Sequence, residues 1–426
     1  MPADRRVLYR YYAYLATTAY GFYLPVGLLY LQREFGWAVA GLTQGVFAFA
    51  LLVAEIPTGY LGDRLGRRAS LAAGNALSAG ALGVFVFLDT PLEYVALYVA
   101  WAVGWAFRSG TEQAYLYEFL AAGGEADEYT RLSGRGSTVV LLTSAVTAAA
   151  ATLLVAYGWA VPLLANAALS AVGIPVVLSL PDVGRQADGD GHAPADGEVG
   201  VGDERSADGE ASADGPGSDA FTVREAVETL RVQVATPEVR WIVAYVAVFH
   251  VLFAVTRPYE APVAAQVGVP VAVVGSMYAG FKLVSAGAAA SAGWFRDVLG
   301  TRRTFALLVP VYGLAYASVA LAPVLVVPVF FLNRSVQKVV RPLRDQYLND
   351  RVADVGRATV LSGASMVLSM AAGTANLFSG TLLDALGPFR FLAGAGVALA
   401  GAGGLLWLAV SPVRDDADAA TPAAAD

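Results

Sequence analysis

The sequence predicts an all-α integral membrane protein with about twelve transmembrane helices in two related six-helix bundles. Of the 426 residues, 57% are hydrophobic and only 15% are charged, and the mean hydropathy is +0.56. Soluble domains normally contain about 25% charged residues, so this composition disfavours a water-soluble enzyme. Apolar stretches long enough to span a membrane recur along the chain, and a motif in the first half returns in the second.

Each candidate span contains roughly the 20 apolar residues that are needed to cross the hydrocarbon core of a membrane. The first half has six of them, at residues 7–33, 39–62, 68–88, 91–120, 132–157 and 159–180. The second half has six more, at residues 238–266, 270–295, 302–323, 325–349, 357–384 and 388–411. Prolines such as Pro25 and Pro258 fall inside these spans. A transmembrane bundle tolerates them because neighbouring helices satisfy the freed backbone groups.

Arginine residues predict the orientation in the membrane. They precede the first span and follow the second, fourth, eighth and tenth: Arg5, Arg6, Arg10, Arg64, Arg67, Arg68, Arg131, Arg135, Arg296, Arg302, Arg303, Arg351 and Arg357. If the spans alternate in direction, all of these residues lie on one side, and an excess of basic residues marks the cytoplasmic side. We therefore expect a multi-pass protein of the plasma membrane with both termini in the cytoplasm.

The chain divides into five predicted segments. An N-terminal bundle covers residues 1–180, and a C-terminal bundle covers residues 236–411. Residues 181–220 are rich in Asp, Gly, Ala and Ser, so we expect an acidic, disordered linker on the cytoplasmic side. Residues 221–235 carry an apolar stripe beside charged positions, which predicts a short amphipathic helix on the membrane surface. Residues 412–426 are expected to form a disordered tail.

The composition also excludes several kinds of site. The chain has no cysteine and two histidines, so disulfides, thiol catalysis and a histidine-rich metal centre are excluded. The net charge of −7 argues against nucleic-acid binding, and the acidic, lysine-poor composition is typical of salt-adapted proteins. In a nucleotide-binding loop the lysine directly follows a glycine. Neither Lys282 nor Lys338 does, so the sequence contains no such loop. We expect a monomer in the lipid bilayer, with no enzymatic activity, cofactor or metal.

A repeated motif predicts the internal symmetry. Residues 59–68 read Gly-Tyr-Leu-Gly-Asp-Arg-Leu-Gly-Arg-Arg, and residues 293–303 read Gly-Trp-Phe-Arg-Asp-Val-Leu-Gly-Thr-Arg-Arg. Asp63 and Asp297 correspond, and each follows the second span of its half, as expected for two parallel repeats. Glycines permit a tight turn here, and Asp63 can pair with an arginine or cap a helix. The alternative is a turn that sets the topology and has no conformational role.

The first copy of the motif resembles the signature of the major facilitator superfamily, and residues 59–68 match every position of it. The second copy is degenerate, since Arg296 stands in the position of Gly62. The resemblance covers most of the chain. It implies two six-helix bundles that rock around a central cavity, with the first, fourth, seventh and tenth helices lining that cavity.

The resemblance also implies that the motif locks the bundles in an outward-facing state. Glu118, at the end of the fourth span, would be the natural partner of Arg64 or Arg67. The residues of this conformational motif are Gly59, Gly62, Asp63, Arg64, Gly66, Arg67, Arg68, Glu118, Asp297, Gly300, Arg302 and Arg303.

Several charged residues fall inside the predicted spans, where each costs roughly 2.5–3.5 kcal/mol on insertion scales and needs a partner or a function. Together with two residues of the first span, they are our candidates for contact with a solute or a proton: Glu55, Arg108, Glu112, Arg257, Glu260, Lys282, Arg334, Lys338, Tyr14 and Thr18. The alternative is that Arg108 with Glu112, and Arg257 with Glu260, are ion pairs that only hold the helices together.

Arg334 and Lys338 lie one helical turn apart, and two such cations repel each other unless a negative charge is near. A bound anionic solute would supply that charge. Glu112 or Glu55 from the other half would supply it as well, so the sequence leaves these explanations open.

Glu112 is the first candidate for a proton carrier. Burial favours its protonated form and the nearby Arg108 favours its ionised form, so a group balanced between them can titrate. His250 is the second candidate, although a buried histidine with a structural role is the simpler reading. We expect three tyrosines near the start of the chain to belong to an interfacial aromatic belt: Tyr9, Tyr11 and Tyr12.

The charges and the resemblance together imply a secondary active transporter of a small polar or ionic solute. It would work by alternating access and be coupled to protons, in efflux or in uptake. A uniporter, a sodium-coupled carrier and a non-transporting sensor on the same fold are the alternatives. Residues 132–157 contain no proline, so the Gly-Pro motif of many drug–proton antiporters is absent from the fifth span.

Overall fold

The computed structural model describes residues 5–183, 237–351 and 357–413 of the chain. The expected amphipathic helix at residues 221–235 lies outside these ranges, as do nearly all of the predicted linker and tail. The side chain of Asp63 is likewise outside the described part. Regular secondary structure in the described ranges is helical throughout, which confirms the all-α prediction.

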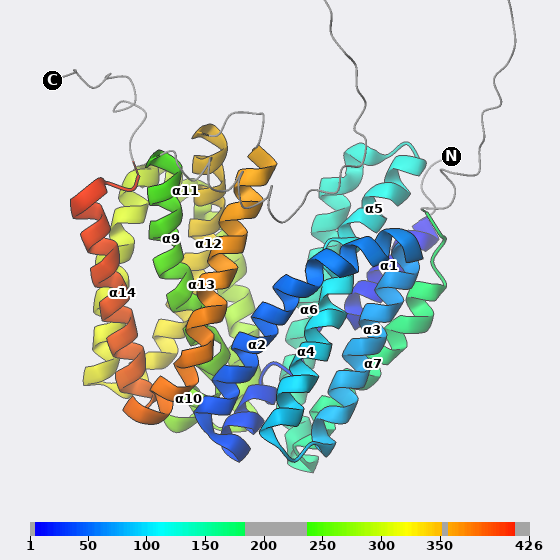
Figure 1. Cartoon of the computed structure of the whole chain (residues 1–426), viewed down its shortest axis with the longest axis horizontal. Helices are drawn as coiled ribbons and strands as arrows, with labels where there is room; N and C mark the ends of the chain where they lie inside the picture. Colours follow the sequence, from blue (N-terminus) through cyan, green and yellow to red (C-terminus); the bar gives the residue numbers. More distant parts are fainter. Residues whose placement is uncertain (1–4, 184–236, 352–356, 414–426) are drawn as a thin grey trace, which may run out of the picture.

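The first bundle begins at Arg5 and ends at Leu178 (Figure 1). Its helices are α1 (Arg5–Thr17), α2 (Gly27–Leu65), α3 (Arg67–Val84), α4 (Pro91–Arg108), α5 (Thr111–Ala122), α6 (Tyr129–Leu154) and α7 (Ala160–Leu178). Short 3₁₀ turns follow α3, precede α6 and follow α6, at Phe85–Phe87, Ala126–Glu128 and Val155–Tyr157.

The second bundle begins at Pro237 and ends at Val410. Its helices are α9 (Pro237–Thr256), α10 (Glu260–Gln266), α11 (Val271–Leu321), α12 (Val326–Arg351), α13 (Arg357–Leu386) and α14 (Pro388–Val410). A 3₁₀ turn, Arg257–Tyr259, connects α9 to α10, and another, Pro323–Leu325, precedes α12.

The helices account for the twelve predicted spans. Within the described ranges, nine helical segments are long and apolar enough to cross a membrane. One of them, α11, turns at Gly300 and therefore makes two spans. The remaining two spans are interrupted ones: α1 with the start of α2 forms the first, and α4 with α5 forms the fourth. The turn between the first and second spans lies at Gly36, where φ is 83°.

The internal repeat is visible in the backbone. Gly66 in the first copy of the motif has φ 88° and ψ 152°, and Gly300 in the second copy has φ 73° and ψ 160°. Residues other than glycine rarely adopt this left-handed region. The two turns therefore have one backbone geometry at corresponding positions, although the side chains around them differ.

The two bundles contact each other mainly along two pairs of helices, α2 against α13 and α6 against α11, and α2 also touches α10. The contact is tightest far from the motif. A Cβ atom added at Gly380 would lie 2.1 Å from the carbonyl oxygen of Trp37, and one at Gly275 would lie 2.1 Å from that of Ala148. Glycine at these positions therefore allows the backbones to approach closely.

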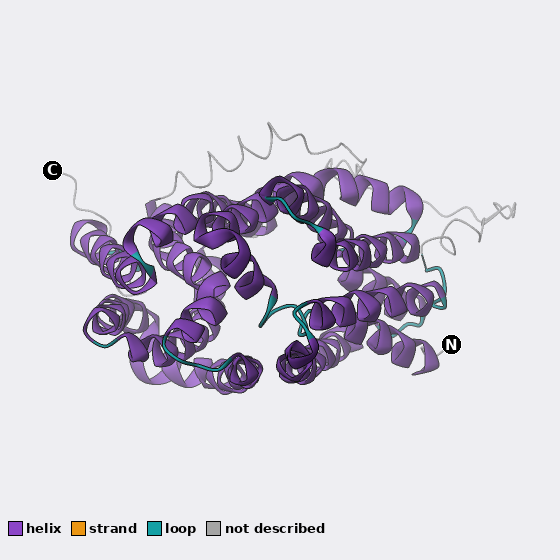
Figure 2. Cartoon of the chain, turned by 90° about the horizontal axis from the view of Figure 1, so that it is seen from below, coloured by secondary structure: helices purple, strands orange, loops and turns teal. Residues whose placement is uncertain are grey.

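Toward the motif the bundles separate, as Figure 1 shows in its upper half. A Cβ atom at Gly59 of α2 would meet no atom of a described residue within 4 Å. Val53 and Ile56 of the same helix are 70% and 64% exposed. We call the end of the molecule that carries residues 59–68 the motif side, and the end where the bundles meet the opposite side. The structure is thus open on the motif side and closed on the opposite side, and Figure 2 views it from the closed end.

Candidate functional site

A buried ion pair lies where the fourth span is interrupted. The chain turns at Ser109–Gly110, where Gly110 has φ 75°, so α4 ends at Arg108 and α5 begins at Thr111. The Arg108 guanidinium Nε lies 3.0 Å from Oε1 of Glu112, and the Arg108 side chain is 6% exposed. The spacing of four residues thus brings the predicted pair together in spite of the turn.

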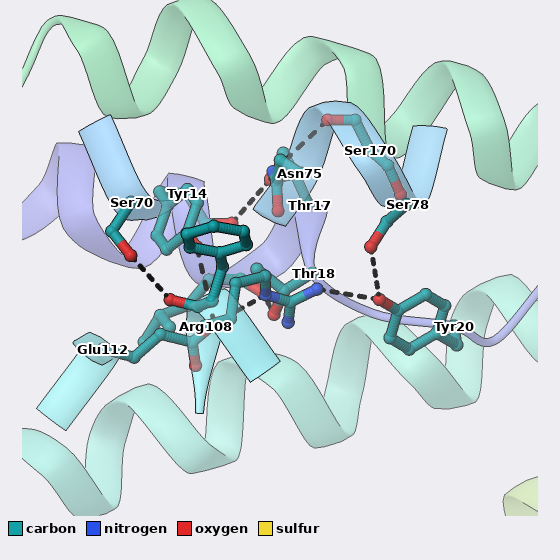
Figure 3. A network of polar contacts seen from close by, with 12 residues as sticks. Tyr14, Thr17, Thr18, Tyr20, Ser70, Asn75, Ser78, Arg108, Glu112 and Ser170 are labelled. Carbon is teal, nitrogen blue, oxygen red and sulfur yellow. Dashed lines mark hydrogen bonds and ion pairs between the residues drawn. The ribbon is translucent and has the colours of Figure 1, made fainter. Parts of the chain in front are cut away.

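Hydroxyl groups extend this pair into a network (Figure 3). Arg108 donates to the Tyr20 hydroxyl over 2.8 Å, and that hydroxyl lies 3.1 Å from Oγ of Ser78. The Tyr14 hydroxyl donates to Oε1 of Glu112 over 3.4 Å. The network links the first, third and fourth spans, and it contains one positive and one negative side chain.

Close packing of α3 on α4 fixes the position of Arg108. A Cβ atom at Gly74 would lie 2.6 Å from Cγ of Arg108 and 2.7 Å from the carbonyl oxygen of Gly104. Ser70, one turn earlier on α3, donates to the carbonyl oxygen of Phe107 over 3.0 Å. The aliphatic stem of Arg108 therefore passes over a position that only glycine can occupy without a shift of its neighbours.

The two candidates on the first span are both buried, and their hydroxyl groups have different partners. Tyr14 is fully buried and directs its hydroxyl to Glu112. Thr18 is buried too, but its hydroxyl donates to the carbonyl oxygen of Leu15 on its own span. Tyr11 is 4% exposed and donates to the carbonyl oxygen of Glu112 over 2.8 Å. Tyr11 thus belongs to the interior and not to an aromatic belt, unlike Tyr9, which is 71% exposed.

A second buried ion pair lies where the seventh span is interrupted. Glu260 is the first residue of α10 and is fully buried. Arg334 of α12 donates to both of its carboxylate oxygens, from Nε over 2.9 Å and from Nη2 over 2.5 Å. The pair therefore joins the seventh span to the tenth, and the partner of Glu260 is Arg334 and not Arg257 as the spacing of three residues suggested.

Aromatic rings surround Arg334. Its guanidinium carbon lies 5.3 Å from the centre of the Phe281 ring, 5.9 Å from that of Phe253 and 6.0 Å from that of Tyr278. Such cation–π contacts stabilise a positive charge away from water. The ring of Tyr259, which precedes Glu260, lies 5.7 Å from the ring of Trp37 in α2, edge-on. The second cluster thus lies next to the first bundle.

Three further cations lie around this pair. Arg257 is exposed, Lys282 is half-buried and Lys338 is exposed, and none of them forms a hydrogen bond or an ion pair with a described residue. Lys282 interacts electrostatically with Arg334, Arg257, Lys338 and Glu260. The predicted partners from the other bundle are engaged elsewhere: Glu112 with Arg108, and Glu55 as acceptor of a hydrogen bond from Ser109 over 3.3 Å. Among the described carboxylates, Glu260 is therefore the one in contact with a cation of this group.

The conformational motif makes contacts within its own bundle. Nε of Arg67 lies 3.1 Å from Oε1 of Glu118, so one of the two suggested pairings is present. Arg68 donates to the carbonyl oxygen of Leu180 over 3.1 Å. The guanidinium of Arg64 lies over the ring of Tyr60. In the second copy, Asp297 pairs with the adjacent Arg296 over 2.9 Å.

His250 lies apart from both ion pairs. It lines a cavity of about 270 Å³ inside the second bundle, together with polar residues of α12 and α13: Gln337, Arg341, Arg344 and Ser369. No cluster of three or more metal-binding side chains occurs in the described ranges.

Sequence reasoning missed two groups that support the ion pairs. Ser78 and the aromatic rings on Arg334 come from other spans, so no spacing along the chain indicates them. A signal for Tyr11 did exist, because it precedes Tyr14 by three residues and shares its helix face.

Comparisons with known proteins agree with the fold. The family model of the Major Facilitator Superfamily matches residues 12–333. An uncharacterised MFS-type transporter of Bacillus subtilis (strain 168), YxaM, is 27% identical over 99 residues, which are 23% of this chain and 25% of the relative. The match therefore spans a quarter of the length of that relative.

Solved structures resemble the chain over nearly its whole length. The nucleoside transporter NupG has a TM-score of 0.71 at 12% identity, covering 96% of this chain and 98% of that one. A D-xylose–proton symporter has a TM-score of 0.62 at 12% identity, covering 95% and 97%. A bacterial homologue of the human lysosomal transporter Spinster, in an inward-facing, unoccupied conformation, has a TM-score of 0.64 at 14% identity, covering 96% of both chains. At such identities these likenesses show the fold alone. With a family model matched over three quarters of its length, the chain belongs to the Major Facilitator Superfamily.

Proposed function

We propose that this protein is a secondary active transporter that carries a small polar or ionic solute across the plasma membrane by alternating access, coupled to protons. One observation carries the proposal: each bundle holds a carboxylate–arginine pair at an interrupted span, Glu112 with Arg108 and Glu260 with Arg334. Within the membrane, a helix is interrupted only where its backbone is buried in protein or lines a water-filled cavity. Such interruptions are common at the solute and ion sites of transporters.

Glu112 is the proton carrier in this proposal. Its side chain is 20% exposed, whereas that of Glu260 is fully buried, so Glu112 is the carboxylate that exchanges protons with water. When Glu112 binds a proton, Arg108 loses its only negative partner in the network. The guanidinium is then available to a solute, which links protonation to binding.

The orientation and the motif complete the proposal. With both termini in the cytoplasm, the motif side faces the cytoplasm, and the described conformation is the inward-open one. In the outward-open conformation, the motif side closes and residues 59–68 lock the bundles together. In the inward-open conformation, the ion pair of Arg67 with Glu118 keeps the motif attached to the fourth span of its own bundle.

Proteoliposomes with an imposed pH gradient and a trapped pH dye test the proposal. We expect the wild-type protein to accumulate one class of solute from a panel of organic anions, sugars, nucleosides, amino acids and cationic drugs, with a matching change in lumenal pH. Glu112→Gln should retain exchange of that solute but lose accumulation driven by the pH gradient. Glu34→Gln is the matched control, because Glu34 is an exposed carboxylate that belongs to neither of the two buried ion pairs.

The other outcomes identify the alternatives. Solute movement without a pH change, equal in Glu112→Gln and the wild type, would mean a uniporter or a sodium-coupled carrier. If no solute of the panel moves, the protein is a sensor on this fold and the transport proposal fails.

A further inference from the structure

We propose that the solute of this transporter is a small organic anion, bound through its carboxylate or phosphate group by Arg257, Lys282 and Lys338 of the second bundle. This inference rests on the proposed function and specifies its substrate class. It is carried by the charge balance of the cluster around Glu260.

The cluster has four cations and one carboxylate. Arg334 uses both oxygens of Glu260, which leaves Arg257, Lys282 and Lys338 without a carboxylate. Like charges inside a membrane protein repel one another strongly, because the surrounding dielectric constant is low. Three uncompensated cations therefore favour the arrival of a negative group from outside the chain.

The other described carboxylates of the second bundle are used elsewhere. Asp297 pairs with Arg296 on the motif side, and Asp345 pairs with Arg344 over 2.5 Å. Asp384 accepts backbone hydrogen bonds from Trp37 and Ala38 on the opposite side. A rearrangement of these side chains would break existing contacts, so none of them is a spare partner.

The free cations are accessible, whereas the paired arginine is not. Arg257 and Lys338 are exposed, and the Arg334 side chain is only 14% exposed. Arg334 thus supports the local structure, and the other cations are available to a ligand. The cluster lies next to the first bundle, because the ring of Tyr259, adjacent to Glu260 in the chain, packs edge-on against the ring of Trp37. Ring surfaces there suit the carbon skeleton of an organic anion.

The first bundle does not compensate this charge. Its central pair, Arg108 with Glu112, is neutral as a whole. Glu55 keeps its negative charge and accepts a hydrogen bond from Ser109 of its own bundle, so five cations stand against three carboxylates in total. The charge of the described central groups is therefore positive. A neutral sugar or a cationic drug would leave the three cations unpaired, and a cation would add to their repulsion.

Binding to the purified full-length protein in nanodiscs tests the inference without requiring transport. The probes are three matched pairs, succinate with succinamide, benzoate with benzamide, and glycerol phosphate with glycerol. The unfolding temperature and the Kd are measured for each probe at one fixed ionic strength. We expect at least one anion to bind and its neutral counterpart not to bind, and the three pairs distinguish dicarboxylate, aromatic carboxylate and phosphate.

Variants locate the binding. Lys338→Ala and Arg257→Gln should each weaken binding of the anion about tenfold or more, since each removes a charge in direct contact with it. Lys338→Arg should keep most of the affinity. Arg390→Gln is the control, because Arg390 is exposed at the opposite side and the same charge is lost.

Three results would overturn the inference: equal binding of an anion and its neutral counterpart, equal weakening by Arg390→Gln, or no binding of any of the three anions. Because binding and transport are measured separately, transport of a neutral solute would refute the anion assignment and leave the proposed function intact. Binding of an anion without transport of any solute would support the anion site and refute the proposed transport function.

Discussion

At the residue scale, the pair of Glu260 with Arg334 illustrates what a charge in a membrane bundle requires. Glu260 is fully buried, and both of its oxygens accept hydrogen bonds from one guanidinium. A buried pair is weak evidence for stability as such, because both charges have lost their hydration. Removal of one partner is a different matter, since it leaves an uncompensated charge in the interior.

A double-mutant cycle measures the cost of leaving one of these two charges unpaired. Glu260→Met and Arg334→Met should each destabilise the protein by about 3–5 kcal/mol, and the double variant should recover much of that loss. Thermal unfolding of the four proteins in detergent, followed by tryptophan fluorescence, measures the effect. If the double variant is as unstable as the sum of the single ones, the two residues do not act as a pair.

The same residues show how far spacing along the chain can predict contacts. The pair of Arg108 with Glu112 was predicted from its spacing of four residues, and the two side chains are in contact although the turn at Ser109–Gly110 separates α4 from α5. The predicted pairing of Arg257 with Glu260 was wrong, since Glu260 pairs with Arg334. Arg257 begins a 3₁₀ turn and Glu260 begins α10, so regular helical spacing does not apply to them.

At the scale of single elements, the important features are the interruptions. The first, fourth and seventh spans are each made of two helical pieces, with irregular backbone or a 3₁₀ turn between them. Gly110 and Pro258 are visible in the sequence, but transmembrane helices tolerate such residues without a break. Whether such a residue interrupts its helix depends on how that helix packs against its neighbours. The sequence of a single span does not give this information.

One capping contact crosses the boundary between the bundles. After the turn at Gly36 the second span begins, and its first backbone N–H groups need acceptors. Oδ1 of Asp384, near the end of α13, accepts from Trp37 over 3.3 Å, and Oδ2 accepts from Ala38 over 2.9 Å. A carboxylate of the second bundle thus caps a helix of the first and holds the opposite side closed.

Loss of this cap should favour opening of the opposite side. Removal of a helix cap typically costs about 1 kcal/mol, or roughly a fivefold shift in an equilibrium. We therefore expect Asp384→Ala to raise the rate at which an impermeant thiol reagent labels Ala40→Cys about fivefold. Ala40 is fully buried in the closed state, and the chain has no cysteine of its own.

The control for this variant is Asp89→Ala, because Asp89 is an exposed carboxylate on the same side that is not part of the cap. Equal labelling rates in Asp384→Ala and Asp89→Ala would mean that the cap does not contribute to closure.

At the scale of the whole molecule, the fold was predictable because its evidence is repeated along the chain. Twelve apolar stretches and two copies of one turn motif fix the number of spans and their parallel halves. The backbone at Gly66 and Gly300 agrees with that repeat. The relative placement of the halves was not predictable, since it depends on contacts such as Gly380 with Trp37 between residues far apart in the sequence.

The placement of the two bundles also shows which contacts belong to this conformation and would be lost in one that opens the opposite side. Closure on the opposite side uses Gly380, Gly275 and the Asp384 cap, whereas on the motif side Gly59 of α2 has no comparable contact with a described residue. Opening of the opposite side must therefore break the contacts at Gly380, Gly275 and Asp384, and closure of the motif side must create new contacts near Gly59. In the proposed mechanism of alternating access, this exchange of contacts exposes one central site to each side in turn.

Distances across both ends of the molecule test alternating access most directly. Because the chain lacks cysteine, spin labels attach only at introduced positions. One double variant replaces Leu65 and Val298 on the motif side, and the other replaces Leu92 and Leu321 on the opposite side; all four residues are exposed. Double electron–electron resonance is recorded in nanodiscs at acidic and alkaline pH, with and without the solute found in the proteoliposome panel.

We expect two populations whose proportions change with pH or solute. In the second population, the motif-side distance shortens and the opposite-side distance lengthens, because the bundles pivot about their shared contact. Unchanged distances at both ends, or changes in the same sense at both ends, in protein that transports solute would contradict alternating access.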